Sequence, residues 1–393
     1  MPRVFLILAT LTAQASACLW DRDTLAEEAK GRGDLVKIIV GWFDRYPPRY
    51  YEMRLERVSK ELQENPNDLE LLDDAAVACD RLGRPDEAID WMEKKKTVLN
   101  ALPSDESPEH HYRYLANLGT FYAHRWISKP ESERNADLSD LRTGEKLIAQ
   151  AIEENPEAHF GREIHQLNAI RWMLWDGDDN KLGIDPVTGI EFGRDSWVSP
   201  HYSPLSNSAD HQYPDGISGL IKLGAAWQNI DAFHALTGAM EYDELTSLAQ
   251  LSYQREIELF ETGARSIHPV YFVRERVYPD PPQLLQNRKP VDEYYKIARA
   301  ATTQRNQSWI AYQNELFDKG LHPDTHPDFW ANWIEPAFPA IPGPSLFDQF
   351  KTLLKNRLGL VASILIVTVA IFVVLFADFI RRRRFKALAS QLP

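Results

Sequence analysis

The sequence predicts an all-α protein in which stacked helical hairpins lead into one C-terminal transmembrane helix. Apolar residues follow helical spacing from Thr24 to about Gly263, whereas the alternation typical of β-strands is scarce. The pattern Leu-x-x-Leu-Gly-x-x-aromatic occurs at residues 115–122 and again at 220–227, which indicates internal repetition. Residues 358–377 form an apolar run without a charged residue, which predicts a membrane span.

Residues 1–17 have the pattern of a secretory signal peptide. A basic start is followed by an apolar run and then by Ala15-Ser16-Ala17, a small-x-small cleavage site. The apolar run is too short to cross a bilayer, which takes about 20 residues. Cys18 is then expected at the start of the mature chain, either as an ordinary residue or as a lipidated cysteine. Ala15 departs from the leucine usual in a lipidation signal. A disulfide between Cys18 and Cys79 is a further alternative.

The C-terminal segment predicts both an anchor and an orientation. At 1.5 Å per residue, residues 358–377 reach across a hydrocarbon core of about 30 Å. Four arginines at 381–384 and Lys386 follow the run, so the tail 378–393 is expected in the cytoplasm. The ectodomain is therefore expected on the extracytoplasmic side. With two cysteines and a lone sequon at Asn306, it fits a bacterial periplasm better than a heavily glycosylated cell surface.

Charge argues against one class of partner. The chain has 44 Lys and Arg against 57 Asp and Glu, a net charge of −13. Residues 18–357 alone carry about −18, because Arg3, the five basic tail residues and Asp378 lie outside them. Nucleic-acid-binding proteins present basic faces, so we expect no nucleic-acid partner.

A weaker copy of the repeat pattern is Leu72-x-x-Ala75-Ala76-x-x-Cys79. On a helix these offsets share one face, and the small residues let a second helix approach closely. Glu64-Asn65-Pro66 and Glu154-Asn155-Pro156 each close an amphipathic helix, because proline cannot continue it.

Together these residues resemble the tetratricopeptide repeat, whose period is about 34 residues. With Pro66 closing one unit, the next is expected to begin at Leu69, to turn at Gly83 and to start its second helix near Pro85. A second unit begins near Tyr112 and has an enlarged hairpin loop around residues 128–139. The expected packing positions are Leu72, Ala75, Ala76, Cys79, Ala88 and Met92 in the first unit, and Leu115, Leu118, Gly119, Tyr122, Gly144, Ile148 and Ala151 in the second. Lys95 and Asn100 depart from the family pattern, which prefers alanine and proline there.

The expected organisation has eight parts. They are a signal peptide (1–17), an N-terminal helical segment (18–48), tetratricopeptide-like repeats (49–175), an irregular loop insertion (176–215), a helical hairpin region (216–320), a Pro- and aromatic-rich juxtamembrane segment (321–357), the transmembrane helix (358–377) and the basic tail (378–393).

The resemblance implies a concave face that binds a protein or peptide partner. Its exposed inner positions are Asp73, Asp80, Arg81, Arg113, Thr120, His124, Ser218, Gln228 and Asn229. A merely solvated helix face is the alternative at each position. The sequence predicts a scaffold without catalytic residues or a cofactor.

Two other functions stay open. The first is a metal-dependent enzyme whose site lies in the 176–216 loop with His201 and His211, although these histidines lack helical spacing and a clear third ligand. The Asp-rich start of this loop lacks the glycine and the acid that a calcium loop needs at its sixth and twelfth positions. The second is a structural envelope protein that acts by self-association. The doubled His-Pro-Asp at 322–328 predicts a turn that carries Phe329, Trp330 and Trp333 to the domain or to the bilayer surface.

Overall fold

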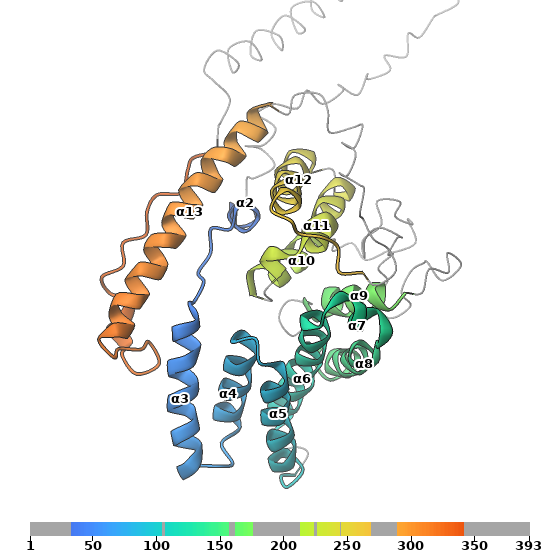
Figure 1. Ribbon diagram of the computed structural model, residues 1–393, viewed down its shortest axis with the longest axis vertical. Helices are drawn as coiled ribbons and strands as arrows, with labels where there is room; N and C mark the ends of the chain where they lie inside the picture. Colours follow the sequence, from blue (N-terminus) through green and yellow to red (C-terminus); the bar gives the residue numbers. More distant parts are fainter. Residues whose placement is uncertain are drawn as a thin grey trace, which may run out of the picture. The chain divides into compact units, whose positions relative to one another are not determined.

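The computed structural model describes residues 33–103, 107–156, 162–175, 213–223, 226–243, 245–268 and 289–341. These residues contain helices and no β-strand, which confirms the predicted all-α fold (Figure 1). The elements are α2 (Gly33–Val40), α3 (Pro48–Glu64), α4 (Leu69–Arg81), α5 (Pro85–Leu99), α6 (Pro108–Ser128), α7 (Glu131–Ala136), α8 (Ser139–Glu154), α9 (Arg162–Leu174), α10 (Tyr213–Leu223), η3 (Ala226–Gln228), α11 (Ile230–Tyr242), α12 (Thr246–Glu261), α13 (Lys289–Asp318) and η4 (Pro327–Trp330).

Local sequence signals set the boundaries of the first helices. α3 ends at Glu64, directly before the predicted stop at Pro66. Asp68 caps α4 by accepting hydrogen bonds from two backbone N–H groups, so α4 begins at Leu69 as predicted. Gly83 has a φ of +72° in the turn that follows α4, a conformation that glycine adopts without strain. Pro85 then opens α5.

Neighbouring helices of residues 48–174 pack in sequence. α4 contacts α3 and α5, α6 contacts α5 and α8, and α9 contacts α8. A Cβ atom built on Gly144 lies 2.9 Å from the carbonyl oxygen of Gly119, so these glycines let α6 and α8 approach closely. Leu72, Ala75, Ala76 and Cys79 are all buried, and the Cys79 thiol is free. Burial raises the pKa of this thiol to about 11.

The enlarged loop of the second hairpin contains the short helix α7. The Trp126 ring at the end of α6 is fully buried, and its Nε1 donates a hydrogen bond to the carbonyl oxygen of Arg134 on α7. The insertion therefore contributes a short, largely exposed helix, and this hydrogen bond ties it to the end of α6.

The described residues of the second copy of the Leu-Gly-aromatic pattern fall in two elements. α10 ends at Leu223, and Trp227 belongs to the separate element η3. Beyond η3, α11 and α12 pack against each other.

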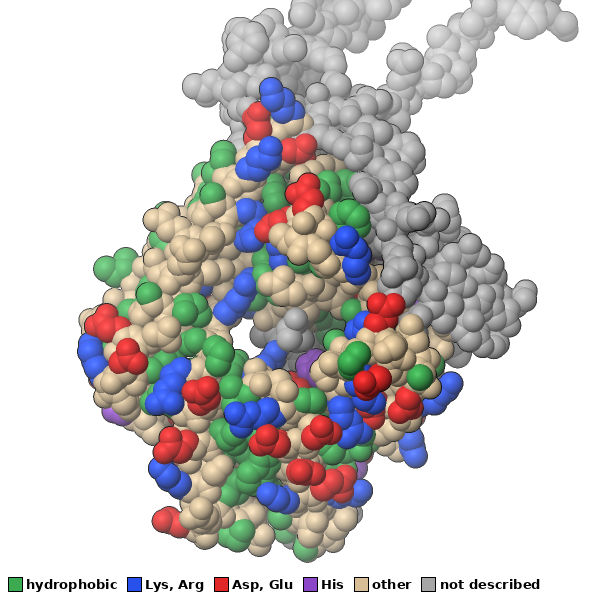
Figure 2. Space-filling model, viewed as in Figure 1, with side chains coloured by type: hydrophobic (Ala, Val, Ile, Leu, Met, Phe, Trp, Pro, Cys, Tyr) green, Lys and Arg blue, Asp and Glu red, His purple; other side chains and the backbone are tan. Residues whose placement is uncertain are grey.

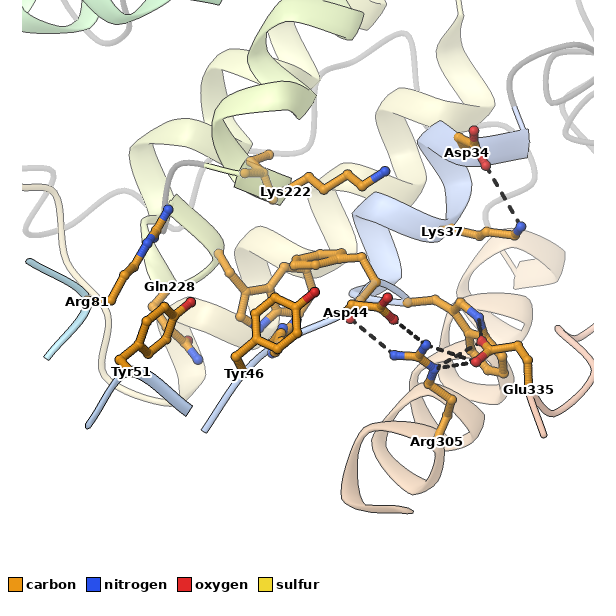
Figure 3. Close-up of a pocket in the computed structure, with 15 residues that line it drawn as sticks. Asp34, Lys37, Asp44, Tyr46, Tyr51, Arg81, Lys222, Gln228, Arg305 and Glu335 are labelled. Atoms are coloured by element: carbon orange, nitrogen blue, oxygen red, sulfur yellow. Dashed lines mark hydrogen bonds and ion pairs between the residues drawn. The ribbon is translucent and has the colours of Figure 1, made fainter. Parts of the chain in front are cut away.

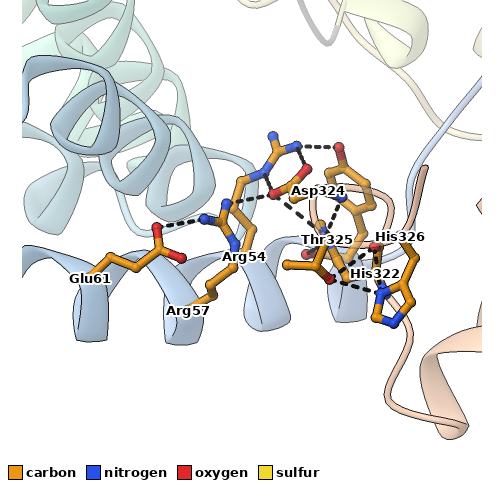
Figure 4. A network of polar contacts seen from close by, with 8 residues as sticks. Arg54, Arg57, Glu61, His322, Asp324, Thr325 and His326 are labelled. Atoms are coloured by element: carbon orange, nitrogen blue, oxygen red, sulfur yellow. Dashed lines mark hydrogen bonds and ion pairs between the residues drawn. The ribbon is translucent and has the colours of Figure 1, made fainter.

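α13 returns the chain to its N-terminal segment (Figure 1). The indole of Trp309 donates a hydrogen bond to the carbonyl oxygen of Arg45, and Nη2 of Arg305 lies 2.6 Å from the Asp44 carboxylate. Past α13, Asp324 accepts hydrogen bonds from Arg54 and Arg57 of α3 (Figure 4). Side chains on α13 therefore bind the 41–46 segment, and Asp324 in the segment after α13 binds α3.

The turn at residues 322–328 carries its aromatic residues to the domain, which decides between the two expected destinations. Phe329 is buried, the Trp330 ring stacks on Trp309 at 4.6 Å, and Trp333 meets the same ring edge-on at 4.9 Å. His322 is buried too, with Nε2 3.1 Å from the carbonyl oxygen of Tyr50.

Among the described residues, no helix combines the length and the apolar character needed to cross a membrane. The predicted span 358–377 lies outside those residues, as do the signal peptide, Cys18, nearly all of the 176–216 loop and the tail 378–393.

Candidate functional site

More than half of the residues predicted to face a ligand line one cavity of about 220 Å³, here called the inner cavity. Five of the nine predicted positions line it, and they are Asp80, Arg81, Thr120, His124 and Asn229. They come from α4, from α6 and from the residue before α11. Positions selected by repeat register thus gather around a single space.

Two polar contacts organise the α6 wall of the inner cavity. Nδ1 of His124 lies 2.9 Å from Oδ1 of Asp80, whose side chain is only 6% exposed. One turn earlier, Thr120 donates to the carbonyl oxygen of Ala116 and accepts a hydrogen bond from Gln166 of α9. These contacts fix both side chains, so the cavity presents a defined polar edge.

The remaining wall of the inner cavity is mainly apolar. It includes Val77, Phe121, Ile127, Ala169, Ile170, Met173, Leu220 and Ile267. An apolar space of this size with one polar edge suits a single large side chain of a partner.

Four predicted positions lie elsewhere, and Asn229 does more than line the cavity. Asp73 is buried against Lys95, so it is not exposed as expected. Arg113 is held on the surface by Glu70 and Glu109. The remaining two are Ser218, whose buried hydroxyl donates to the carbonyl oxygen of Asp215, and Gln228, which is exposed beside Arg255. The side chain of Asn229 also caps α11.

A second and larger space was not predicted. This cavity, here called the arginine cavity, has a volume of about 930 Å³ and is lined from α2, the 41–46 segment, α3, α4, α10, η3, α13 and residue 335 (Figure 3). Figure 2 shows a hollow on one face with Lys and Arg side chains at its edge. The run from Trp42 to Tyr46, which combines aromatic residues with Arg45, is the faint signal of this site in the sequence, because the other walls come from distant parts of the chain.

No group of three or more His, Cys, Asp or Glu side chains within the described ranges could hold a metal ion. His201 and His211, the candidate ligands of the enzyme alternative, lie outside those ranges. The enzyme alternative therefore stays a prediction.

Comparisons with protein-family models, curated proteins and solved structures find no match to this chain.

Proposed function

We propose that this chain is a helical-repeat scaffold, tethered to a membrane by residues 358–377, that holds a protein or peptide partner at the inner cavity. The observation that supports the proposal best is the convergence of Asp80, Thr120 and His124 on one largely apolar space. The resemblance of residues 49–175 to tetratricopeptide repeats supports the same reading, since such arrays bind partners on the inner faces of their first helices.

The cavity favours an apolar anchor from the partner. A large side chain that enters a largely apolar cavity loses much of its contact with water, and anchors of this kind dominate the affinity of many interfaces. The Asp80–His124 pair at the edge then offers a fixed polar contact to the backbone or a neighbouring side chain of the partner. The cavity is too small for a folded element, so the partner inserts one residue.

Crosslinking in the native membrane, followed by purification of the full chain, tests this proposal. The informative variant is Ala169→Phe, which fills the cavity from α9. We expect one stoichiometric protein partner with the wild type and its loss with this variant. His124→Leu, which removes the polar contact with Asp80 at a similar side-chain volume, is expected to weaken recovery and provides a second variant if Ala169→Phe does not fold.

The matched control is Arg113→Gln. Arg113 was predicted on the same inner face but lies outside the cavity walls, so its loss is expected to leave partner recovery unchanged. Equal recovery from the wild type and a folded Ala169→Phe would refute the site. Recovery of other copies of the same chain alone would favour the self-association alternative.

A further inference from the structure

Four arginine side chains gather where the 41–46 segment, η3, α12 and α13 meet. Three of them lie over the ring of Trp227: the guanidinium carbon of Arg255 is 3.9 Å from the ring centroid, that of Arg45 is 4.4 Å away and that of Arg299 is 5.3 Å away. Arg305 belongs to the same group and lies 5.1 Å from the ring of Trp309. Such a concentration of positive charge needs counter-charges.

Three of the four arginines have carboxylate partners. Glu258 pairs with Arg255 at 2.9 Å and with Arg299 at 2.7 Å. Arg305 pairs with Asp44 at 2.6 Å and with Glu335 at 2.9 Å (Figure 3). These pairs account for the acidic groups at the centre of the cluster.

Arg45 has no carboxylate within ion-pair distance among the described residues. Its Nη2 makes a long hydrogen bond of 3.4 Å to the carbonyl oxygen of Gly41, and its Nε is buried without an acceptor. The guanidinium lies against the rings of Phe43 and Trp227, which position it but supply no formal negative charge.

The surroundings make this cation costly to keep without a counter-ion. Burial, and after it the charges of Arg255, Arg299 and Arg305, lowers the pKa of Arg45 to about 10. The group is still protonated at neutral pH, so a partly buried positive charge faces three others. A bound anion would relieve this repulsion and satisfy the free N–H donors.

The arginine cavity lies against this cation. Its wall carries five basic side chains (Lys37, Arg45, Arg81, Lys222 and Arg305) and three acidic ones (Asp34, Asp44 and Glu335), so it is positive in a chain whose net charge is −13. Figure 3 shows Lys222, Tyr46 and Tyr51 around the same space. Lys222 has no hydrogen-bond or ion-pair partner within the described part of the chain.

We propose that the arginine cavity binds a small anionic ligand, whose carboxylate or phosphate group pairs with Arg45 and Lys222 and whose apolar or ring-shaped body lies against the aromatic wall. Arginine presents a planar fork of donors that matches either oxyanion, and lysine adds a point charge. Phe43, Tyr46 and Trp227 supply flat faces for the body of the ligand. This site does not rest on the partner-binding proposal, which uses a different cavity.

Calorimetric titration of the purified full chain at low ionic strength tests the proposal with three probes: phenyl phosphate, benzoate and inorganic phosphate. We expect saturable binding of at least one of the two aromatic anions, weakened by added salt. The aromatic probe that binds more tightly shows whether the site prefers a phosphate or a carboxylate group. Inorganic phosphate is expected to bind more weakly than phenyl phosphate, because it lacks a body for the aromatic wall, and equal affinity would overturn that part of the proposal.

Arg45→Gln is expected to weaken the aromatic anion by about 10-fold or more, the loss typical of a charged hydrogen bond. Arg49→Gln removes the same charge from the exposed surface of α3, four residues away, and is expected to leave affinity unchanged. Lys222→Gln changes an exposed side chain without disturbing the packing on Trp227, so it decides the matter if Arg45→Gln is unstable. No saturable binding, or an equal loss in Arg49→Gln and Arg45→Gln, would overturn the site.

Discussion

Lys95 on α5 has no exposed surface, and its Nζ lies 2.5 Å from Oδ2 of Asp73 on α4. Burial raises the pKa of Asp73 and lowers the pKa of Lys95, while the opposite charge of each partner opposes these shifts. Position 95 is where the tetratricopeptide pattern prefers alanine. This chain therefore has an ion pair at a position where that pattern would place a methyl group. Asp73 is buried in this pair and does not face a ligand.

Removal of one partner of this pair is expected to destabilise the fold strongly. Lys95→Ala leaves the Asp73 carboxylate buried without its counter-charge, so the free energy of unfolding should fall by about 3–5 kcal/mol. Urea denaturation of the full chain measures the change. The double variant Asp73→Leu/Lys95→Met replaces both charges with apolar groups and should recover most of the loss; a double variant no more stable than Lys95→Ala would contradict this account.

Gly41 is expected to tolerate no side chain. Its φ is +82°, and a Cβ atom there would lie 2.5 Å from the Trp227 ring. Gly41→Ala therefore combines backbone strain with a steric clash and should lower the melting temperature clearly, with strain alone costing about 1–3 kcal/mol. Gly83→Ala is the matched control, because Gly83 has a φ of +72° and open space around it. Equal melting temperatures for the two variants would show that the contact with Trp227 is unimportant.

We expect the free energy of unfolding to fall at acidic pH as Asp324 takes up a proton. Burial alone would raise the pKa of this carboxyl, but hydrogen bonds from Arg54 and Arg57 outweigh it and lower the pKa to about 2. The folded state therefore holds the proton more weakly than the unfolded state, whose pKa is about 3.9. The stabilisation is complete above the unfolded value and is lost as pH falls from about 4 towards 2.

Unfolding free energies measured at several pH values in this window check the assignment. Asp324→Asn should be less stable than the wild type at neutral pH, and the difference should shrink as pH falls. The control Asp90→Asn changes an exposed carboxyl on α5 and should leave the pH profile of the wild type intact. A constant difference between Asp324→Asn and the wild type across the window would rule out the linkage.

Two buried histidines are expected to destabilise the fold at mildly acidic pH. Burial lowers the pKa of His165 to about 4, and it does the same for His268 despite the hydrogen bond of the latter to the carbonyl oxygen of Trp172. Both rings are neutral in the folded state, whereas the unfolded state takes up protons near pH 6.5. Stability should therefore decline as pH falls from about 6.5 to 4. In thermal or urea unfolding, His165→Leu should make the free energy of unfolding depend less steeply on pH in this range. An unchanged pH dependence would exclude His165 as a cause of the decline.

The parts of the fold that were predicted correctly depend on short-range signals. Pro66 and Pro85 mark boundaries that the chain obeys, and Gly119 marks a close helix contact, because each acts within a turn or two of its own position. The same logic places Thr120 and His124 one turn apart on one face of α6, and both line the inner cavity.

The errors have a common physical cause. Helix register predicts which face Asp73 occupies, but not that Lys95 reaches it from the next helix. The arginine cavity could not be predicted, because Asp44 and Arg305 are separated by 261 residues and only the return of α13 brings them together. Interactions between distant segments leave no periodic trace in a sequence.

The ion pairs between α3 and Asp324 have a consequence for how the chain acquires its structure. Arg54 and Asp324 are separated by 270 residues, so during synthesis the first helices leave the ribosome long before their acidic partner exists. A linear array of hairpins can form one unit at a time and fray from either end. In this protein a segment made late contacts one made early, and a nascent chain that stops short of residue 324 would leave Arg54 without its ion-pair partner and Arg57 paired with Glu61 alone. Because this contact joins segments that are far apart in the sequence, we expect it to form late and slowly during folding.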